Sequence, residues 1–221
     1  MIDGVDESEL KHWIENSLAE NSHVLAAGYQ GKTLLYQRDG HKLVIKTPHG
    51  TGISRLIHTH MLRHEYQVYK RLAGYPFAPA CYGMVDNRFL VLEHIEGTTI
   101  RDRRPDDEAA YIEKLFEAIQ QLHARDVAHM DLKKKDNLLV TSGDNPCLLD
   151  FGAAVIRRPG LHPLNRFRYR LARQFDYNAW VKHKYHDRMH AISDADRVYY
   201  RVTRIEALAS RLKQIFTSRA G

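Results

Sequence analysis

Two short stretches near the middle of the chain place four polar side chains at a spacing that few folds can use. The first stretch contains Asp131, Lys133 and Asn137, and the second, a few residues later, contains Asp150 within an Asp-Phe-Gly triplet. One Asp can orient a hydroxyl, a Lys can meet phosphate charge, and an Asn with a second Asp can hold Mg²⁺. The two stretches therefore predict a site for phosphoryl transfer.

The run from His129 to Asn137, followed by Asp-Phe-Gly, resembles the H-R-D-L-x-x-x-N and D-F-G motifs of the protein-kinase superfamily. The resemblance implies that Asp131 accepts or orients the proton of the attacking hydroxyl and that Lys133 contacts the transferred phosphate. It further implies that Asn137 and Asp150 hold Mg²⁺, with ATP as the phosphate donor. His129 is expected to pack the loop under the D-F-G segment.

The earlier part of the chain supplies the other elements of this family in the same order. Residues 23–46 read as three strands, with Gly28 and Gly31 at the first turn, where backbone N–H groups can approach phosphates. The third strand ends at Lys46, which is similar to the ATP-binding lysine of V-A-I-K. Glu65 is the candidate partner of Lys46 on the next helix.

Residues 81–92 predict two strands around the Asp86-Asn87 turn, and the segment after them resembles the hinge between the two kinase lobes. In that family the backbone of the hinge binds adenine. The resemblance therefore implies that Glu93, His94 and Ile95 line the adenine pocket.

These elements predict an α+β, two-lobed protein-kinase-like fold, with a small antiparallel-sheet N-lobe and a truncated, mainly helical C-lobe. We expect an N-terminal helical extension over residues 1–22, an N-lobe over 23–92, and a hinge with a compact C-lobe and basic C-terminal helices over 93–221. Apolar periodicity predicts helices over 6–20, 56–72, 106–125, 169–185 and 196–217.

The sequence also departs from the family pattern. Asp131 and Asn137 are six positions apart where the family has five, so either Asn137 or Asp136 could be the metal ligand. Met130 replaces the Arg that pairs with a phosphorylated loop. Residues 153–175 contain no Ser or Thr, and Tyr169 is their only hydroxyl. Asp176, near a Trp, is expected to support the catalytic loop.

Charge is unevenly distributed along the chain. Residues 157–221 carry 15 Lys and Arg against 5 Asp and Glu, within a net charge of +6. This bias favours an anionic acceptor, either glycolipid or protein, and a peripheral membrane contact through the basic C-terminal third; no specific nucleic-acid partner is expected. The acidic N-terminus and the two isolated cysteines predict a cytoplasmic protein, placed at the inner membrane surface if that contact forms.

The short region after the D-F-G triplet resembles the compact bacterial kinases that phosphorylate lipopolysaccharide core sugars, and also the atypical RIO-type kinases. The first resemblance predicts transfer of the γ-phosphoryl of Mg-ATP to a lipopolysaccharide core sugar or a similar anionic glycolipid. The alternatives are a RIO-like serine/threonine protein kinase and a catalytically inactive pseudokinase that serves as a binding module.

Overall fold

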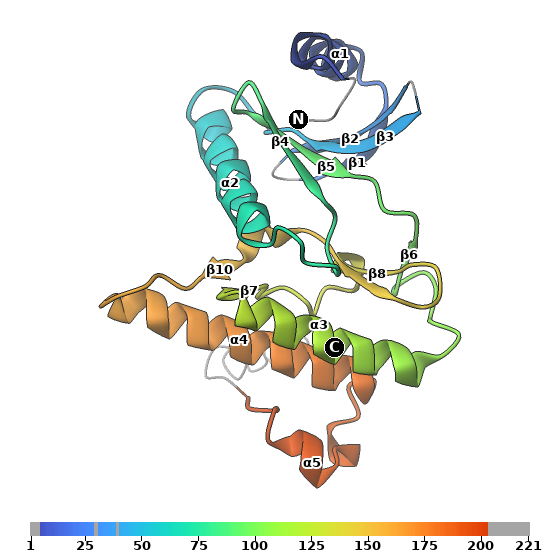
Figure 1. Cartoon of the computed structure of the whole chain (residues 1–221), viewed down its shortest axis with the longest axis vertical. Helices are drawn as coiled ribbons and strands as arrows, with labels where there is room; N and C mark the ends of the chain where they lie inside the picture. The colour runs from blue at the N-terminus through green and yellow to red at the C-terminus, as the bar shows by residue number, and fades with distance from the viewer. Residues whose placement is uncertain (1–4, 29–30, 39, 203–221) are drawn as a thin grey trace, which may run out of the picture.

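The computed structural model describes residues 5–28, 31–38 and 40–202, which form two lobes stacked along the long axis (Figure 1). The upper lobe is built on an antiparallel sheet, and the lower lobe is built on two long helices. This is the two-lobed α+β fold expected from the motifs. The division of the chain at residues 22 and 92 stays a prediction.

The upper sheet has five antiparallel strands in the order β1-β2-β3-β5-β4. The strands are β1 Val24–Ala27, β2 Lys32–Arg38, β3 His41–Lys46, β4 Cys81–Val85 and β5 Phe89–Glu93. The β4–β5 connection is a tight turn in which Asp86 and Asn87 both have a φ of 51°. Asn and Asp tolerate this left-handed backbone, so the predicted turn is confirmed.

Helix α1, Glu7–Glu20, covers one face of this sheet and begins one residue after the predicted start. Asp6 is its N-cap, and the Asp6 side chain accepts from the backbone N–H groups of Ser8 and Glu9. Trp13 and Ile14 pack against sheet residues that include Ile45 of β3. Successive side chains of a strand point to opposite faces. Lys46 therefore projects from the other face, toward helix α2 and the lower lobe.

Helix α2, Gly52–Arg71, runs beside the sheet, and it begins four residues before the predicted start at residue 56. Its first two turns carry Ile53, Leu56 and Ile57, all of which are exposed, and the first buried residue is His58. The predicted helix is present, and its start was placed late because apolar periodicity reports only the turns that pack on a core.

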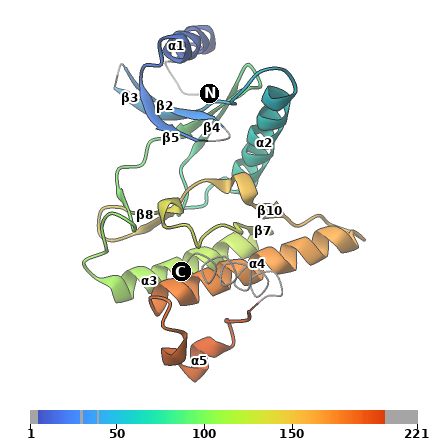
Figure 2. The same ribbon diagram turned by 180° about the vertical axis from the view of Figure 1, so that it is seen from behind.

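The lower lobe contains α3, Glu108–Ala124, and α4, Pro163–Lys184, which lie side by side in both views (Figure 2). The Trp180 indole donates to the Ile112 carbonyl at 3.0 Å across the two helices. The helix predicted from residue 169 begins earlier, at Pro163, because the exposed Leu164 and Phe167 add no buried periodicity. Pro163 itself marks the start of the helix in the sequence, because proline is favoured at the first helical position.

Short strands and 3₁₀ turns precede, separate and follow the two long helices, and those between α3 and α4 carry the polar motifs. β6 Thr98–Thr99 pairs with β8 Leu138–Val140, which pairs with β9 Pro146–Leu148, and β7 Val127–Ala128 pairs with β10 Val155–Ile156. The 3₁₀ turns are Lys135–Asn137, Phe151–Ala153 and Met189–Ala191. One core of buried apolar side chains joins α2, β5, α3, β8, β9 and α4 beneath these segments.

The helix predicted over 196–217 is only partly tested. Helix α5 spans Asp194–Arg197, and residues 198–202 are not helical, so that part of the prediction is wrong. Residues 203–217 lie outside the described residues. In the part of the chain that the structure describes, no helix is both long enough and apolar enough to cross a bilayer.

Candidate phosphotransfer site

Lys46 joins three segments of the fold at the junction of the two lobes. Its Nζ donates to Glu65 Oε1 of α2 at 2.7 Å and to Asp150 Oδ1 at 2.9 Å. Glu65 is buried, and the same Oε1 atom accepts the backbone N–H of Phe151 at 3.2 Å. The sheet, α2 and the Asp-Phe-Gly segment are therefore joined through one ammonium and one carboxylate.

The electrostatics of this cluster favour charged side chains. Burial alone lowers the pKa of Lys46, but Glu65 and Asp150 outweigh it, and the net pKa is raised above the usual value. Burial acts to raise the pKa of Asp150. The positive charge of Lys46, with smaller effects of His129 and Lys134, outweighs burial, so the net pKa is lowered. Lys46 can thus meet an anion, and the Asp150 carboxylate is ionised at neutral pH.

The segment that contains Asp131 is held by hydrogen bonds at both ends. Asn137 Nδ2 donates to the Asp131 carbonyl at 3.0 Å and to its Oδ2 at 3.1 Å. His129 Nε2 bonds the Leu149 carbonyl at 2.8 Å, and its ring lies 4.7 Å from that of Phe151. The predicted packing role of His129 under the Asp-Phe-Gly segment is confirmed.

Asp176 of α4 supports this loop from below, as predicted. Its side chain is fully buried and accepts the backbone N–H groups of His129 at 2.8 Å and Met130 at 2.7 Å. It also bonds His123 Nε2 at 2.9 Å. Met130 has a φ of 71°, an unusual conformation for a residue with a side chain, and the Asp176 bond fixes its amide there.

The structure distinguishes the environments of the two candidates left open by the inserted residue. Asp136 is turned outward and pairs with Arg101 Nε at 2.8 Å. Asn137 is buried beside Asp131, and among the described residues no donor occupies its Oδ1 atom. The second oxygen of Asp150, Oδ2, is likewise unpaired there. Two unpaired hard oxygens of this kind fit Mg²⁺, which keeps water and phosphate oxygens as its other ligands.

Comparison with known proteins identifies the family of the chain. The model of the protein kinase domain family matches residues 20–180. The chain belongs to the protein kinase family.

Relatives of this kinase domain include the serine/threonine-protein kinase US3 homolog of Equine herpesvirus 1 (strain Ab4p), which is 30% identical over 140 residues. That match covers 59% of this chain and 34% of the relative. CBL-interacting protein kinase 3 of Oryza sativa subsp. japonica is 39% identical over 75 residues, 31% of this chain and 17% of the relative. The matched region thus spans about a third of the viral kinase and less of the plant kinase.

Gly28 and Gly31 flank the connection between β1 and β2 of this kinase domain. The Gly28 N–H donates to the Gly31 carbonyl at 2.9 Å, and the Gly31 N–H donates back at 3.3 Å. A Cβ atom on Gly31 would collide with the backbone carbonyl of Thr47, whereas one on Gly28 would meet open space. Only Gly31 is therefore required by a close backbone approach. Contact of either glycine with ATP stays a prediction.

The hinge residues are placed less uniformly than predicted. Glu93 Oε2 accepts the Ala80 N–H at 2.9 Å, so its side chain is engaged with the loop before β4. The His94 N–H points at the Lys42 carbonyl at a long 3.4 Å. The backbone groups of Ile95 have no hydrogen-bond partner in the described part of the chain, and they remain the predicted contact for adenine.

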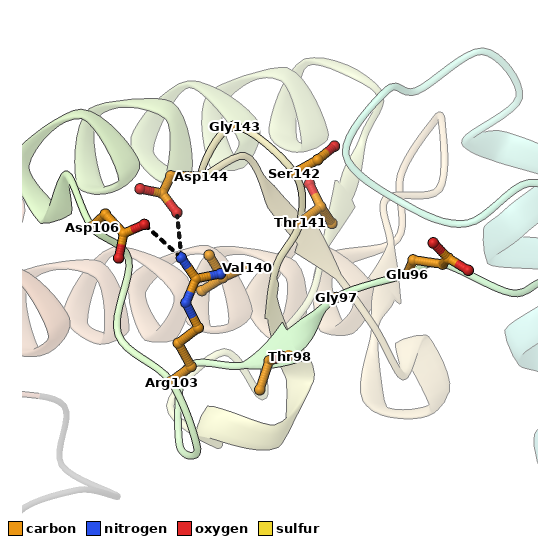
Figure 3. Close-up of a pocket in the computed structure, with 10 residues that line it drawn as sticks. All are labelled: Glu96, Gly97, Thr98, Arg103, Asp106, Val140, Thr141, Ser142, Gly143 and Asp144. Carbon is orange, nitrogen blue, oxygen red and sulfur yellow. Dashed lines mark hydrogen bonds and ion pairs between the residues drawn. The ribbon is translucent and has the colours of Figure 1, made fainter.

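A separate pocket of about 350 Å³ lies beside the hinge. It is lined by the residues that lead into β6 and by the turn between β8 and β9 (Figure 3). Arg103 reaches across it to Asp106 at 2.7 Å and to Asp144 at 3.7 Å. A Cβ atom on Gly97 would clash with the Val140 carbonyl, which explains the close approach of the two segments. None of the predicted site residues lines this pocket.

Two further histidines support the site and were missed from the sequence. His64 Nε2, on α2, bonds the Ala154 carbonyl at 2.8 Å, and His183 Nε2, on α4, bonds the Leu132 carbonyl at 2.8 Å. Each contact joins residues that lie far apart in the sequence. No local spacing could indicate them, because both depend on tertiary packing: His64 joins α2 to the segment after Asp150, and His183 joins α4 to the catalytic loop within the lower lobe.

Proposed function

We propose that this chain is a Mg²⁺- and ATP-dependent serine/threonine protein kinase. The observation that carries the proposal is the Lys46–Glu65–Asp150 cluster, set beside an Asp131 that Asn137 holds in place. These are the groups that phosphoryl transfer requires on both sides of the transferred phosphate.

Each side chain has a distinct role in the proposal. Lys46 binds the nucleotide phosphates, and Glu65 holds its ammonium in position. Asp131 orients the acceptor hydroxyl and takes its proton, and Lys133 meets the charge of the transferred phosphoryl group. Asn137 and Asp150 would hold Mg²⁺, which supplies charge neutralisation at the phosphates when bound.

The protein acceptor rests on the relatives. Three that match this chain are named as serine/threonine-protein kinases or as a CBL-interacting protein kinase. The comparisons give no support to the glycolipid acceptor, which the sequence suggested through a resemblance and a charge bias. We therefore favour the alternative stated there. The membrane contact and the cytoplasmic location stay predictions, and residues 203–221, within the basic third, lie outside the described residues.

A matched pair of substitutions tests the proposal. Purified protein is incubated with Mg²⁺ and γ-labelled ATP, together with a soluble protein extract or a detergent-solubilised envelope extract. Asp131→Asn should reduce protein labelling by about 10²- to 10⁴-fold, the contribution of a positioned base. Asp136→Asn makes the same chemical change five positions later, at a side chain that pairs outward with Arg101, and should retain most of the labelling.

The location of the label distinguishes the acceptors. Label on Ser or Thr of protein supports the proposal, whereas label confined to glycolipid would restore the sugar-kinase interpretation. Equal labelling by wild type and Asp131→Asn would reject catalysis by this loop.

A further inference from the structure

The catalytic loop presents three consecutive cations beside Asp131. Lys133, Lys134 and Lys135 are all exposed, and no carboxylate of the described residues lies within ion-pair distance of any of them. The adjacent acid, Asp136, does not neutralise them because it pairs with Arg101 at 2.8 Å. The loop therefore carries unpaired positive charge on the surface that an acceptor must approach.

The backbone that carries these lysines is fixed. The Lys134 N–H donates to the Asp131 carbonyl at 3.3 Å, and the Asn137 N–H donates to the Lys134 carbonyl at 3.0 Å. Leu132 is buried, and its carbonyl accepts from His183. A fixed backbone confines the charges to the neighbourhood of Asp131, and this preorganisation favours electrostatic recognition of a ligand.

The segment that follows Asp150 adds charge of the same sign. Residues 151–175 contain six Arg and neither Asp nor Glu. Arg157 is paired with Asp126 at 2.7 Å, but Arg158, Arg166, Arg168 and Arg170 are exposed and form no ion pair within the described ranges. Clustered charge of one sign attracts ligands of the opposite sign.

We propose that this kinase domain prefers hydroxyl acceptors flanked by acidic residues, and that Lys134 and Lys135 determine this specificity. The inference rests on the proposed function and names the substrate class of the same site. Lys133 is left out of the specificity pair because its predicted partner is the transferred phosphate. The inserted residue in this loop lengthens the run of lysines and leaves two of them for the acceptor.

Three synthetic peptides test the inference with Mg²⁺-ATP. Each has one central Ser, with flanks of Asp and Glu, of Gln and Ala, or of Lys and Arg. We expect kcat/KM for the acidic peptide to exceed that for the neutral peptide by about tenfold, which corresponds to about 1.4 kcal/mol. The ratio should fall toward one when NaCl is raised from about 0.02 M to about 0.5 M, because salt screens exposed charges.

Substitutions assign the preference to the loop. Lys134→Glu/Lys135→Glu should lower the acidic-to-neutral ratio below one, and Lys134→Gln/Lys135→Gln should bring it close to one. Lys11→Glu is a distant charge-reversal control, which makes one of the two charge reversals of the Glu variant at another surface, since Lys11 lies on α1 and pairs with Asp86 on the far side of the upper sheet. The control should keep the wild-type ratio, and thermal melting checks that every variant folds.

The outcomes separate this inference from the proposed function. Equal turnover of all three peptides, abolished by Asp131→Asn, would keep the kinase and overturn the acidic preference. Binding of the wild type to phosphatidylglycerol vesicles through these lysines, with no peptide preference, would assign them to a membrane surface and overturn it as well. Phosphorylation of none of the three peptides, nor of any protein in the extract, would overturn both.

Discussion

Replacing Asp176 by Asn should separate the support of the catalytic loop from its chemistry. Asp176 is fully buried, and its two carboxylate oxygens accept three hydrogen bonds. One oxygen accepts the Met130 N–H at 2.7 Å, and the other accepts the His129 N–H at 2.8 Å and bonds His123 Nε2 at 2.9 Å. The substitution changes one oxygen to an NH₂ group with almost no change in volume.

The expected cost follows from counting the partners that are lost. With its carbonyl oxygen toward His129, the Asn leaves the Met130 N–H without an acceptor; in the other orientation it leaves the His129 and His123 donors without one. In the first orientation the NH₂ group of the Asn also faces a donor and lacks an acceptor, so at least two donors are unsatisfied in either case. Each unsatisfied donor costs about 1–3 kcal/mol, so the free energy of unfolding should fall by about 2–5 kcal/mol. A loss of about 3 kcal/mol lowers Tm by about 6–12 °C in a domain of this size.

Urea titration and thermal melting measure the stability loss, and peptide phosphorylation measured well below the melting temperature gives kcat. We expect kcat to fall by about 10²-fold, because a displacement of about 1 Å at a positioning group can cost that much. Asp126→Asn is the matched control. Its carboxylate is partly exposed and pairs with Arg157 and Arg71, so its loss should cost less than about 1 kcal/mol.

The reasoning would be refuted if Asp176→Asn and Asp126→Asn were equally stable and equally active. That result would mean that the backbone of residues 129 and 130 keeps its conformation without the buried acceptor.

Three further predictions concern other supports of the site. Burial is the main cause that lowers the pKa of His183 below 6.5, so just below that pH the unfolded chain binds more protons than the folded chain. The free energy of unfolding of the wild type should therefore fall as the pH drops through this range. His183→Gln should remove that part of the loss, which urea titrations at about pH 5.5 and 7.5 would measure. Gly31→Ala should lower Tm because its Cβ meets a backbone carbonyl, whereas Gly28→Ala should leave Tm nearly unchanged. Glu65→Gln should cost about 1.5–3 kcal/mol in unfolding free energy and reduce the thermal stabilisation given by Mg²⁺-ATP; an unchanged nucleotide shift would contradict the role of the carboxylate.

Strand patterning made the upper lobe predictable from the sequence. The alternation that buries Leu43 and Ile45 against α1 leaves Lys46 on the opposite face, and a period of two residues admits no other placement. The Asp86-Asn87 turn could be recognised for the same reason, since few residues accept its backbone conformation. The orientation of Lys46 and the position of the turn both follow from residues that are neighbours in the sequence.

Helix boundaries and loop orientations were less predictable because they depend on distant partners. Both α2 and α4 begin with exposed apolar residues, so the periodicity used to find them starts several residues late. The sequence favoured Asn137 as the metal ligand and left Asp136 as an alternative. The structure gives the two side chains different environments, because Asp136 pairs with Arg101, 35 positions earlier, and the assignment of the metal ligand stays a prediction.

The supports of the catalytic loop bear on how the proposed kinase would be controlled. Met130 stands where the resemblance to the kinase motif implies an Arg that pairs with a phosphorylated loop. The hydroxyl of Tyr169 is buried and donates to the His123 carbonyl at 3.0 Å. A phosphate on that hydroxyl would have to displace a hydrogen bond inside the packed interface of α3 and α4. The loop instead takes its order from Asp176, a buried carboxylate that is satisfied in the folded state without any modification. Assembly of the site is therefore coupled to the packing of α4 beneath the loop, and a substitution that loosens this packing should impair stability and phosphoryl transfer together.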